Sequence, residues 1–258
     1  MIDSLYIGET GLVSSQVNLD VISNNMANIN TNGFKKDKVN FEDLLYRTSP
    51  VSPNLLGDMS YQQKVGSGSN IVSTEKVFTD GNLIQTDNQL DIAISGNGLF
   101  EVIYNQTELA YTRNGSFKVN DDGLLTTTDG FVLSDIIQVP EEARSLVIRN
   151  SGEVFADVGQ SDLVSIGEIN IANFINNAGL EPAGRNLYLA TSEAGEATIG
   201  TPGENGLGLL QQGFVEASNV DVTEEIVNLV LAQQGFQLNA KVIQASDEML
   251  SISNDLYR

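Results

Sequence analysis

The sequence predicts an α+β fold, with helices at both ends that pack as a coiled coil and a central all-β domain preceded by an extended irregular segment. Three observations support this class. Apolar residues recur at intervals of seven near both ends, as in helices that contact a partner helix. Short alternating apolar runs in the middle are separated by Asn-Gly and Asp-Gly turn signals. The 258 residues, 41% of them apolar, also suffice for a substantial core.

The N-terminal helix is predicted from Asp3 to about Ile29, a stretch without proline. A seven-residue repeat implies a partner helix. Asn32-Gly33 supplies a stop signal, because glycine accepts the left-handed conformation that follows a helix. The seam consists of apolar residues at spacing seven, joined late by two isoleucines: Leu5, Leu12, Leu19 and Met26, with Ile22 and Ile29.

The segment over 34–70 is predicted to connect the N-terminal helix to the β domain. Its later part, 47–70, carries two prolines, three glycines and many Ser and Asn residues. This composition indicates a long irregular segment, and one of that length is usually functional or a linker.

Strands are predicted over 71–218. The clearest alternating runs start at Leu90 and at Phe100, and further runs cover 146–155 and 164–174. A last strand over 213–216 closes the unit before the C-terminal helix. The turn signals between these runs are Asn97-Gly98, Asn114-Gly115, Asp122-Gly123 and Asp129-Gly130.

The C-terminal helix occupies 219–258, with Asp221 and Glu224 resembling a capping box at its start. One seam position is apolar throughout and the other is mostly polar, so a simple two-stranded coil is not expected. Either the helix packs in a larger array or its stripe docks on a globular core. The apolar stripe is Val222, Leu229, Phe236, Ile243, Leu250 and Tyr257, and the second position is Ile226, Gln233, Ala240, Asp247 and Asn254.

Composition excludes several classes of function. With no His and no Cys, the chain cannot build a Ser-His-Asp triad, a Cys nucleophile or a typical zinc site. The net charge of −21 falls mostly in 119–258, with 5 Lys/Arg against 21 Asp/Glu, and repels nucleic acid and anionic membranes. No apolar run approaches the roughly 20 residues of a membrane helix. The N-terminus also lacks the basic flank and apolar block of a cleavable Sec-type signal.

Motifs that invite an enzymatic or ligand-binding interpretation are better explained as turns or caps. Gly96-Asn97-Gly98 and Gly206-Leu207-Gly208 lack the third glycine of a phosphate loop. Asn120-Asp121-Asp122-Gly123 lacks the alternating ligands of a calcium loop. Carboxylate pairs such as Glu224-Glu225 suit the positive end of a helix. We therefore expect no catalytic, cofactor-binding or metal-binding residues.

Five Asn residues lie within 24–32, although Asn is a mediocre helix former. Some of them could end the helix in a capped turn. Alternatively, the amides of Asn24, Asn25 and Asn28 hydrogen-bond to neighbouring chains across a polar, uncharged interface.

The stretch over 23–35, SNNMANINTNGFK, resembles the signature of the bacterial flagellar rod and hook family. The stretch 41–46, FEDLLY, is similar to the one that follows in distal-rod members. One departure is 233–236, QQGF, where the family more often has an Arg or Ala and a Tyr; it leaves the local helix packing open. Further stretches match in order, so that the resemblance covers essentially the whole chain: 111–117, 179–181, 186–188 and 213–222.

The resemblance implies a structural subunit of the distal rod, a hollow helical polymer that transmits torque from motor to hook through the periplasm. Family members pair their terminal helices into an inner coiled-coil tube and hold a β domain outside it. An extra segment at the place of 47–70 stiffens the tube. The expected assembly interface combines the helix seams and the Asn side chains: Leu5, Leu12, Leu19, Ile22, Met26, Asn24, Asn25, Asn28, Val222, Ile226, Leu229, Phe236, Ile243, Leu250 and Tyr257.

The same resemblance implies the partners. These are further copies of the chain, the proximal rod and hook proteins, the P- and L-ring proteins around the rod, and the flagellar type III export apparatus. Two alternatives remain open at this point. The chain could be another rod or hook subunit, or, in a different class, a secreted β-rich adhesin or binding module that stays monomeric. A carboxylate glycosidase is a remote third, because it needs two acidic groups facing one cleft.

Overall fold

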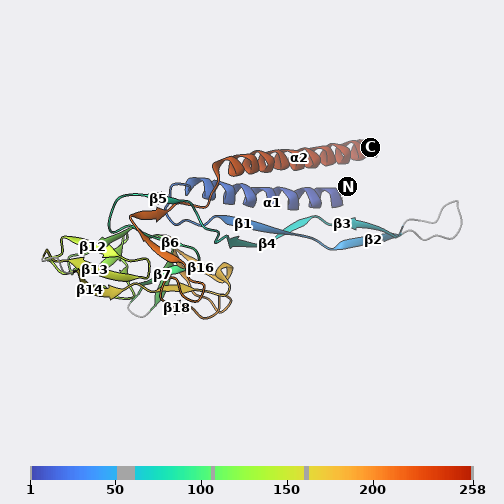
Figure 1. The fold of residues 1–258 in the computed structure, drawn as a ribbon. Helices are drawn as coiled ribbons and strands as arrows, with labels where there is room; N and C mark the ends of the chain where they lie inside the picture. The colour runs from blue at the N-terminus through green and yellow to red at the C-terminus, as the bar shows by residue number, and fades with distance from the viewer. Residues whose placement is uncertain (1, 51–61, 106–107, 160–162, 257–258) are drawn as a thin grey trace. The chain divides into compact units, whose positions relative to one another are not determined.

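The computed structural model describes residues 2–50, 62–105, 108–159 and 163–256 (Figure 1). The chain divides into two compact units. The helical unit comprises Met1–Met26, Asp37–Glu75 and Val222–Arg258, and the β unit comprises Ala27–Lys36 and Lys76–Asp221. The elements support the predicted α+β class, with a helix near each end and a mostly β middle.

The two helices are α1 (Ile2–Ala27) and α2 (Val222–Asp255), and a short 3-10 helix, η1, covers Asn177–Gly179. The strands are β1 (Asp37–Asp43), β2 (Tyr46–Pro50), β3 (Gln62–Gly66), β4 (Ser69–Lys76), β5 (Leu83–Gln85), β6 (Ile92–Ser95), β7 (Leu99–Ile103), β8 (Leu109–Thr112), β9 (Phe117–Val119), β10 (Leu125–Thr127), β11 (Val132–Leu133), β12 (Ser145–Ile148), β13 (Glu153–Asp157), β14 (Leu163–Glu168), β15 (Ile171–Asn173), β16 (Glu181–Gly184), β17 (Leu187–Leu189), β18 (Thr198–Gly200), β19 (Leu209–Gln212) and β20 (Phe214–Glu216).

In the helical unit, α1 lies alongside α2 (Figure 1), and two glycines of α1 mark their closest approach. A Cβ atom on Gly8 would lie 2.8 Å from Cγ1 of Ile243, and one on Gly11 would lie 2.6 Å from Nδ2 of Asn239. The two backbones come this close because glycine has no side chain to separate them. The pairing of these helices as a coiled coil remains a prediction.

The buried residues of α2 do not follow the second seam position that the sequence predicts. Buried residues recur at 225, 232 and 246, and Asn239 continues the same spacing of seven. The prediction placed this line one residue later, at Ile226 and its successors, and Ile226 is exposed. Ala232 and Ser246 are small, so they fit between closely approaching helices where a larger side chain does not.

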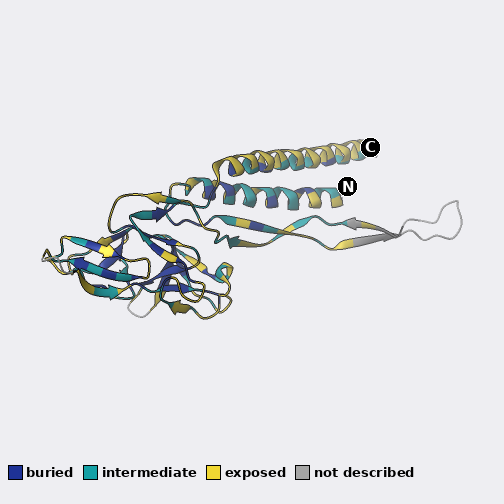
Figure 2. Ribbon diagram, in the orientation of Figure 1, coloured by how far each residue is buried: buried dark blue, intermediate teal, exposed yellow. Residues whose placement is uncertain are grey.

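The other side of α1 lies along a two-stranded ribbon made of β1 and β4. Ser14 Oγ is 3.3 Å from Ser69 Oγ, and Asn25 exchanges hydrogen bonds with the backbone of Asp37 at 2.9 and 2.8 Å. Because α1 is held between α2 and this ribbon, it is the more enclosed of the two helices (Figure 2).

The prediction of an irregular segment over 47–70 is wrong in its described parts. β2 and β3 pair antiparallel from Tyr46 opposite Gly66 to Pro50 opposite Gln62, and β4 begins at Ser69. The Ser and Pro residues that suggested a loop are tolerated because a ribbon of two strands has an open edge on both sides. Residues 51–61 lie outside the described part of the chain.

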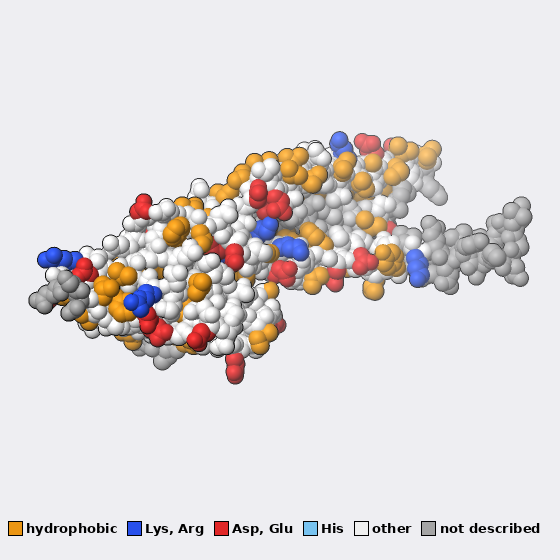
Figure 3. Space-filling model, viewed as in Figure 1, with side chains coloured by type: hydrophobic (Ala, Val, Ile, Leu, Met, Phe, Trp, Pro, Cys, Tyr) orange, Lys and Arg blue, Asp and Glu red, His pale blue; other side chains and the backbone are white. Residues whose placement is uncertain are grey.

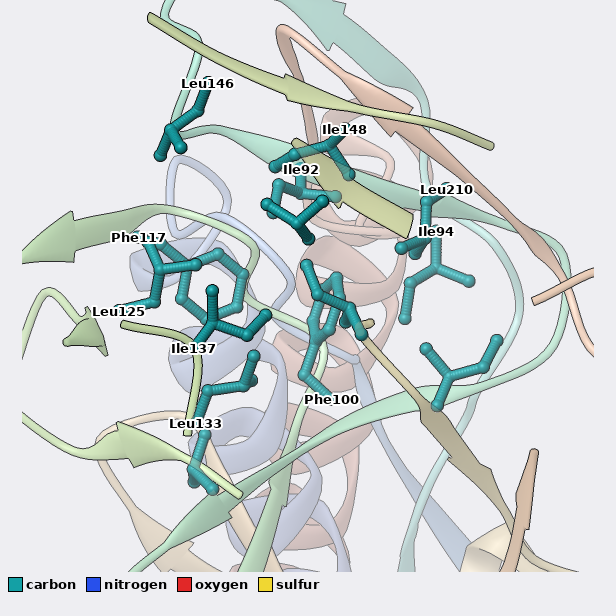
Figure 4. Close-up of a cluster of buried hydrophobic side chains, with 14 of the residues drawn as sticks. Ile92, Ile94, Phe100, Phe117, Leu125, Leu133, Ile137, Leu146, Ile148 and Leu210 are labelled. Atoms are coloured by element: carbon teal, nitrogen blue, oxygen red, sulfur yellow. The ribbon is translucent and has the colours of Figure 1, made fainter. Parts of the chain in front are cut away.

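The β unit is built on a sheet whose main path runs β16-β17-β8-β7-β11-β10-β9, with β15 also pairing with β7 and β18 pairing with β15. A second sheet has the order β12-β13-β14, and two further pairs join β19 to β6 and β20 to β5. Alternating side chains of these strands form one large core (Figure 4), which includes Ile92, Phe100, Leu125, Leu133 and Leu210.

Several local predictions are confirmed in the β unit. The stretch Asn120–Gly123 is a hairpin turn between β9 and β10, in which Asn120 Oδ1 accepts hydrogen bonds from Asp122 N and Leu124 N. Gly33 adopts φ +70°, as predicted for its position. However, α1 ends at Ala27, so Gly33 belongs to the loop beyond the helix and does not cap it.

Candidate functional site: a buried ion cluster and an apolar helix face

Three charged side chains from separate sequence motifs meet inside the β unit. Lys35 is the last residue of the motif at 23–35, Arg113 lies in the motif at 111–117, and Glu216 lies in the motif at 213–222. Each of the three residues is at most 4% exposed. Such burial requires compensation, because an isolated charge is strongly disfavoured away from water.

The Glu216 carboxylate is the centre of this ion cluster. Its Oε1 accepts hydrogen bonds from Lys35 Nζ at 2.7 Å and from the Gly81 backbone N–H at 2.8 Å. Its Oε2 accepts a hydrogen bond from Arg113 Nε. Both oxygens are therefore satisfied, and two cations face one fully buried anion.

Arg113 uses the rest of its guanidinium to bind backbone carbonyls. Nη2 donates to Ile94 O at 2.9 Å and to Gly96 O at 2.6 Å, and Nη1 donates to Gly98 O. Nη2 also lies 3.2 Å from Oδ1 of Asp80, whose side chain is largely exposed. The turn over 96–98, predicted to be a turn and no phosphate loop, thus binds a cation through its carbonyls.

Burial and the neighbouring opposite charges shift the pKa values of Lys35 and Glu216 in opposite directions. Burial is the largest influence on Lys35 and lowers its pKa. Burial would raise the pKa of Glu216, but the charges of Arg113 and Lys35 outweigh it, and the pKa of this carboxyl lies below its ordinary value of 4.5. Glu216 is therefore a carboxylate at neutral pH, which the cluster requires.

Backbone and amide hydrogen bonds tie the two segments that adjoin the helices to each other. Gly33 N donates to Glu216 O at 2.7 Å, and Lys36 N donates to Asn219 Oδ1 at 2.7 Å. Asn186, from a further motif, donates from Nδ2 to Asn32 O at 2.6 Å. The motif segments 27–36 and 213–221 are consequently fixed together on the β unit.

Sequence reasoning identified these motifs without predicting that they meet. The available signal was chemical: each motif holds a charged residue among mostly polar or apolar neighbours. Nothing in the spacing along the chain shows that Lys35 and Glu216, 181 residues apart, form an ion pair.

The predicted interface residues of α1 fall on its enclosed sides, except for Asn24, which is exposed. Ile22 and Asn25 are buried, and Leu5, Leu12, Leu19 and Met26 are half-buried. The Asn residues make hydrogen bonds within the chain: Asn24 and Asn25 to Asp37, and Asn28 with Thr31. Their proposed contacts to neighbouring chains remain a prediction.

The predicted interface residues of α2, which are its stripe and Ile226, divide between two environments. Leu229, Ile243 and Leu250 are half-buried, while Val222, Ile226 and Phe236 are exposed. Tyr257 lies outside the described residues.

A second apolar line on α2 was missed in the sequence. Its members follow one another at spacings of seven, four, seven, three and four, which is the repeat of a coiled-coil seam. Their exposed fractions range from 48% to 82%, and Figure 3 shows hydrophobic side chains along α2. We call this line the outer seam: Leu231, Leu238, Val242, Met249, Ile252 and Leu256.

Comparison with known proteins matches three stretches of the chain to models of flagellar rod and hook proteins. Residues 5–35 match the model described as "Flagella basal body rod protein". Residues 93–156 match "Flagellar hook protein FlgE/F/G D1 domain", and residues 211–256 match "Flagellar basal body rod FlgEFG protein C-terminal".

Full-length relatives agree with these matches. The flagellar basal-body rod protein FlgG of Buchnera aphidicola is 43% identical over 254 residues, which cover 97% of this chain and 98% of the relative. FlgG of Borreliella burgdorferi is 38% identical over the whole of both chains. FlgG of Bacillus subtilis is also 38% identical and covers 97% of each chain.

Replacing Gly33 with alanine is expected to destabilise the β unit strongly. A Cβ atom there would lie 2.6 Å from Asn114 N, in addition to the strain of φ +70°. Gly130→Ala is the matched control, because its φ is +89° but nothing lies within 4 Å of the added carbon. We expect Gly33→Ala to cost about 1–3 kcal/mol more than the control in urea unfolding. Equal costs would show that the close approach is unimportant.

Replacing Glu216 with glutamine is expected to cost about 3–5 kcal/mol, because it leaves buried cations without their anion. Glu153→Gln is the control: it breaks an exposed ion pair with Arg149, which contributes at most about 1 kcal/mol. Adding Lys35→Met to Glu216→Gln should recover part of the loss by removing one uncompensated charge. Urea unfolding measures all three variants.

The stability difference between the wild type and Glu216→Gln should also depend on pH. Because the folded pKa of Glu216 lies below 4.5, its contribution is fully present above that pH and is lost as pH falls through the folded pKa. Free energies of unfolding measured from pH 7 downward should therefore converge. A constant difference would contradict the role of this carboxylate.

Proposed function

The chain belongs to the family of bacterial flagellar basal-body rod proteins, in which it is a structural subunit of the distal rod, and we propose how its copies hold together. In this proposal the terminal helices of neighbouring copies pack through the outer seam of α2 into a tube, and the β units lie outside it. The observation that carries the proposal is the outer seam itself.

The outer seam supports association for a physical reason. Six apolar side chains recur at coiled-coil spacing on a helix surface, and each remains 48% to 82% exposed in the described part of the chain. Contiguous exposed apolar surface of this kind marks an interaction site. A neighbouring face of α2 meets α1. A helix with contact surfaces on two sides fits an array of helices better than a two-stranded coil.

Burial of the outer seam favours a polymer over the alternative of a monomeric adhesin. A monomer would leave the seam in water, which forfeits about 25 cal/mol for each Å² of apolar surface that association could bury. A head-to-tail contact that does not close on itself repeats without limit and yields a filament. Each copy then contacts the next copy through one surface and the preceding copy through a different surface.

Family membership places the protein in the flagellar basal body, where rod and hook components assemble. We further propose that proximal rod and hook proteins meet the ends of the polymer, that P- and L-ring proteins surround it, and that type III export delivers the subunit without a cleaved signal. Neither described helix combines the length and apolar character needed to cross a membrane.

The ribbon of β2 and β3 is proposed to stiffen the tube by contacting neighbouring copies. A two-stranded ribbon is at best marginally stable by itself in water, so such a contact would order it. Exposed side chains such as Leu45 and Tyr46 at its base provide apolar surface for that contact.

Leu238→Asp is expected to abolish rod assembly while leaving the monomer stable. Leu238 lies on the outer seam and is 62% exposed, so the carboxylate is solvated in the monomer but would be buried without a partner in the polymer. Gln237→Asp is the control, since it adds the same charge at an adjacent exposed position off the seam. Motility and rod formation report assembly, and thermal melting reports the fold. Normal rods from Leu238→Asp would refute the seam as the assembly contact.

Deleting residues 47–68 is expected to permit polymerisation but to make the tube bendable. A variant in which a Gly/Ser linker of equal length replaces them controls for chain length, because it keeps the reach but not the strand pairing. Micrographs of both variants should show curved rods. Straight rods from the deletion would rule out stiffening by the ribbon.

A further inference from the structure

The chain contains four Asn-Gly steps, and each has the groups for one intramolecular reaction. The glycine backbone nitrogen attacks the side-chain amide carbon of the asparagine, and glycine allows the approach because it has no Cβ. A cyclic imide forms as the bond to the side-chain nitrogen breaks, and that nitrogen leaves as ammonia with the proton of the glycine N–H. Water then adds across one C–N bond of the imide and yields aspartate or isoaspartate. The four steps lie at 32–33, 97–98, 114–115 and 205–206.

The fold controls this reaction through the peptide that joins the two residues. That peptide must rotate until the glycine nitrogen faces the amide carbon. Hydrogen bonds to the peptide and packing around the glycine oppose the rotation, so a held step reacts only after local opening. The four steps are therefore similar in an unfolded chain and can differ in the folded one.

The step at 32–33 is held at both ends of its peptide. Gly33 N, the attacking atom, donates a hydrogen bond to Glu216 O at 2.7 Å. Asn32 O accepts a hydrogen bond from Asn186 Nδ2 at 2.6 Å. Gly33 is also buried. Rotation of this peptide would break both hydrogen bonds inside the β unit.

The step at 97–98 is held by two carbonyl groups. Asn97 O accepts a hydrogen bond from Gly208 N at 2.7 Å, and Gly98 O accepts one from Arg113 Nη1. Gly98 is buried, although Asn97 is exposed. Rotation here would remove a carbonyl from a buried guanidinium, which is costly.

The step at 114–115 is held by its side chain and by packing. Asn114 Oδ1 accepts a hydrogen bond from Ser116 N at 3.1 Å. Gly115 is buried, and a Cβ atom added to it would overlap Ile92 O. The glycine therefore has no room to turn toward the asparagine side chain.

The step at 205–206 is different in each of these respects. Both residues are exposed, and no described residue forms a hydrogen bond with either of them. Nothing lies within 4 Å of a Cβ atom added to Gly206. The φ angles of +51° and +81° are those of a two-residue hairpin turn. A single hydrogen bond closes this turn, from Leu207 N to Glu204 O at 2.8 Å.

We propose that Asn205 is a modification site, at which the folded protein converts by itself to aspartate and isoaspartate, while the fold protects the other three steps. The conversion adds a carboxylate to a chain that already carries −21. Isoaspartate also inserts the Cβ atom into the main chain, so the turn before β19 loses the geometry that the φ angles now give it. The proposal does not depend on assembly.

Incubation of the purified chain at neutral pH tests the proposal, with peptide mass spectrometry measuring aspartate and isoaspartate at each of the four steps over time. The same chain in urea is the matched control, because unfolding removes the hydrogen bonds and the packing. In the folded chain we expect step 205–206 to react at least about tenfold faster than each of the others. In urea we expect the four rates to become similar.

Three results would overturn the proposal. Another step could react as fast as 205–206 in the folded chain. Folding could slow step 205–206 as much as it slows the other three. The product at residue 205 could also be aspartate without isoaspartate, which would show direct hydrolysis by water and no attack by Gly206 N.

Gly206→Ala tests the attacking atom, because the added Cβ hinders the approach of that nitrogen. We expect the rate at residue 205 to fall about tenfold. Gly195→Ala is the matched control: its φ is +84°, nothing lies within 4 Å of the added carbon, and step 205–206 is unchanged. Thermal melting checks the fold of both variants. An equal rate at residue 205 in the two variants would contradict the proposal.

Discussion

The structure depends on one constraint, the compensation of the buried carboxylate of Glu216. A charge removed from water at this depth is tolerated only with close partners of opposite sign and satisfied lone pairs. Lys35, Arg113 and the Gly81 N–H provide them. Because these residues come from distant parts of the sequence, meeting this requirement brings together the segment after α1, the segment before α2 and the turn over 96–98. The close approach of Gly33 to Asn114 follows from the same convergence.

The two faces of α2 have complementary roles. The face toward α1 contains small or polar side chains, such as Ala232, Asn239 and Ser246, and the half-buried Ile243 lies against Gly8. Small side chains allow the two helices to approach closely. Six exposed apolar side chains lie on the outer seam instead. In the proposed assembly this apolar surface is buried between copies, and helices that are marginal in isolation gain order from that contact.

The sequence predicted the elements that local patterns determine and missed those that depend on distant pairing. Both helices and the hairpin at Asn120–Gly123 follow from repeats and turn residues within a few positions of one another. The pairing of β2 with β3 was missed because the proline, glycine and asparagine residues of 47–70 have low strand propensity. The ion cluster was missed because no local pattern relates Lys35 to Glu216. The outer seam was readable in the sequence, but the regular sevenfold stripe beginning at Val222 obscured it.

The strong negative charge sets a condition on every contact between copies. Screening at physiological salt extends over only about 8 Å, so exposed carboxylates on facing surfaces of two copies still repel at contact distance. Surfaces that meet in the polymer must therefore be uncharged or must neutralise their own charge internally. The outer seam meets the condition with apolar side chains. The remaining acidic side chains are left to solvent, where mutual repulsion opposes contacts other than the few that are free of charge. An acidic surface of this kind favours one mode of association by disfavouring the others.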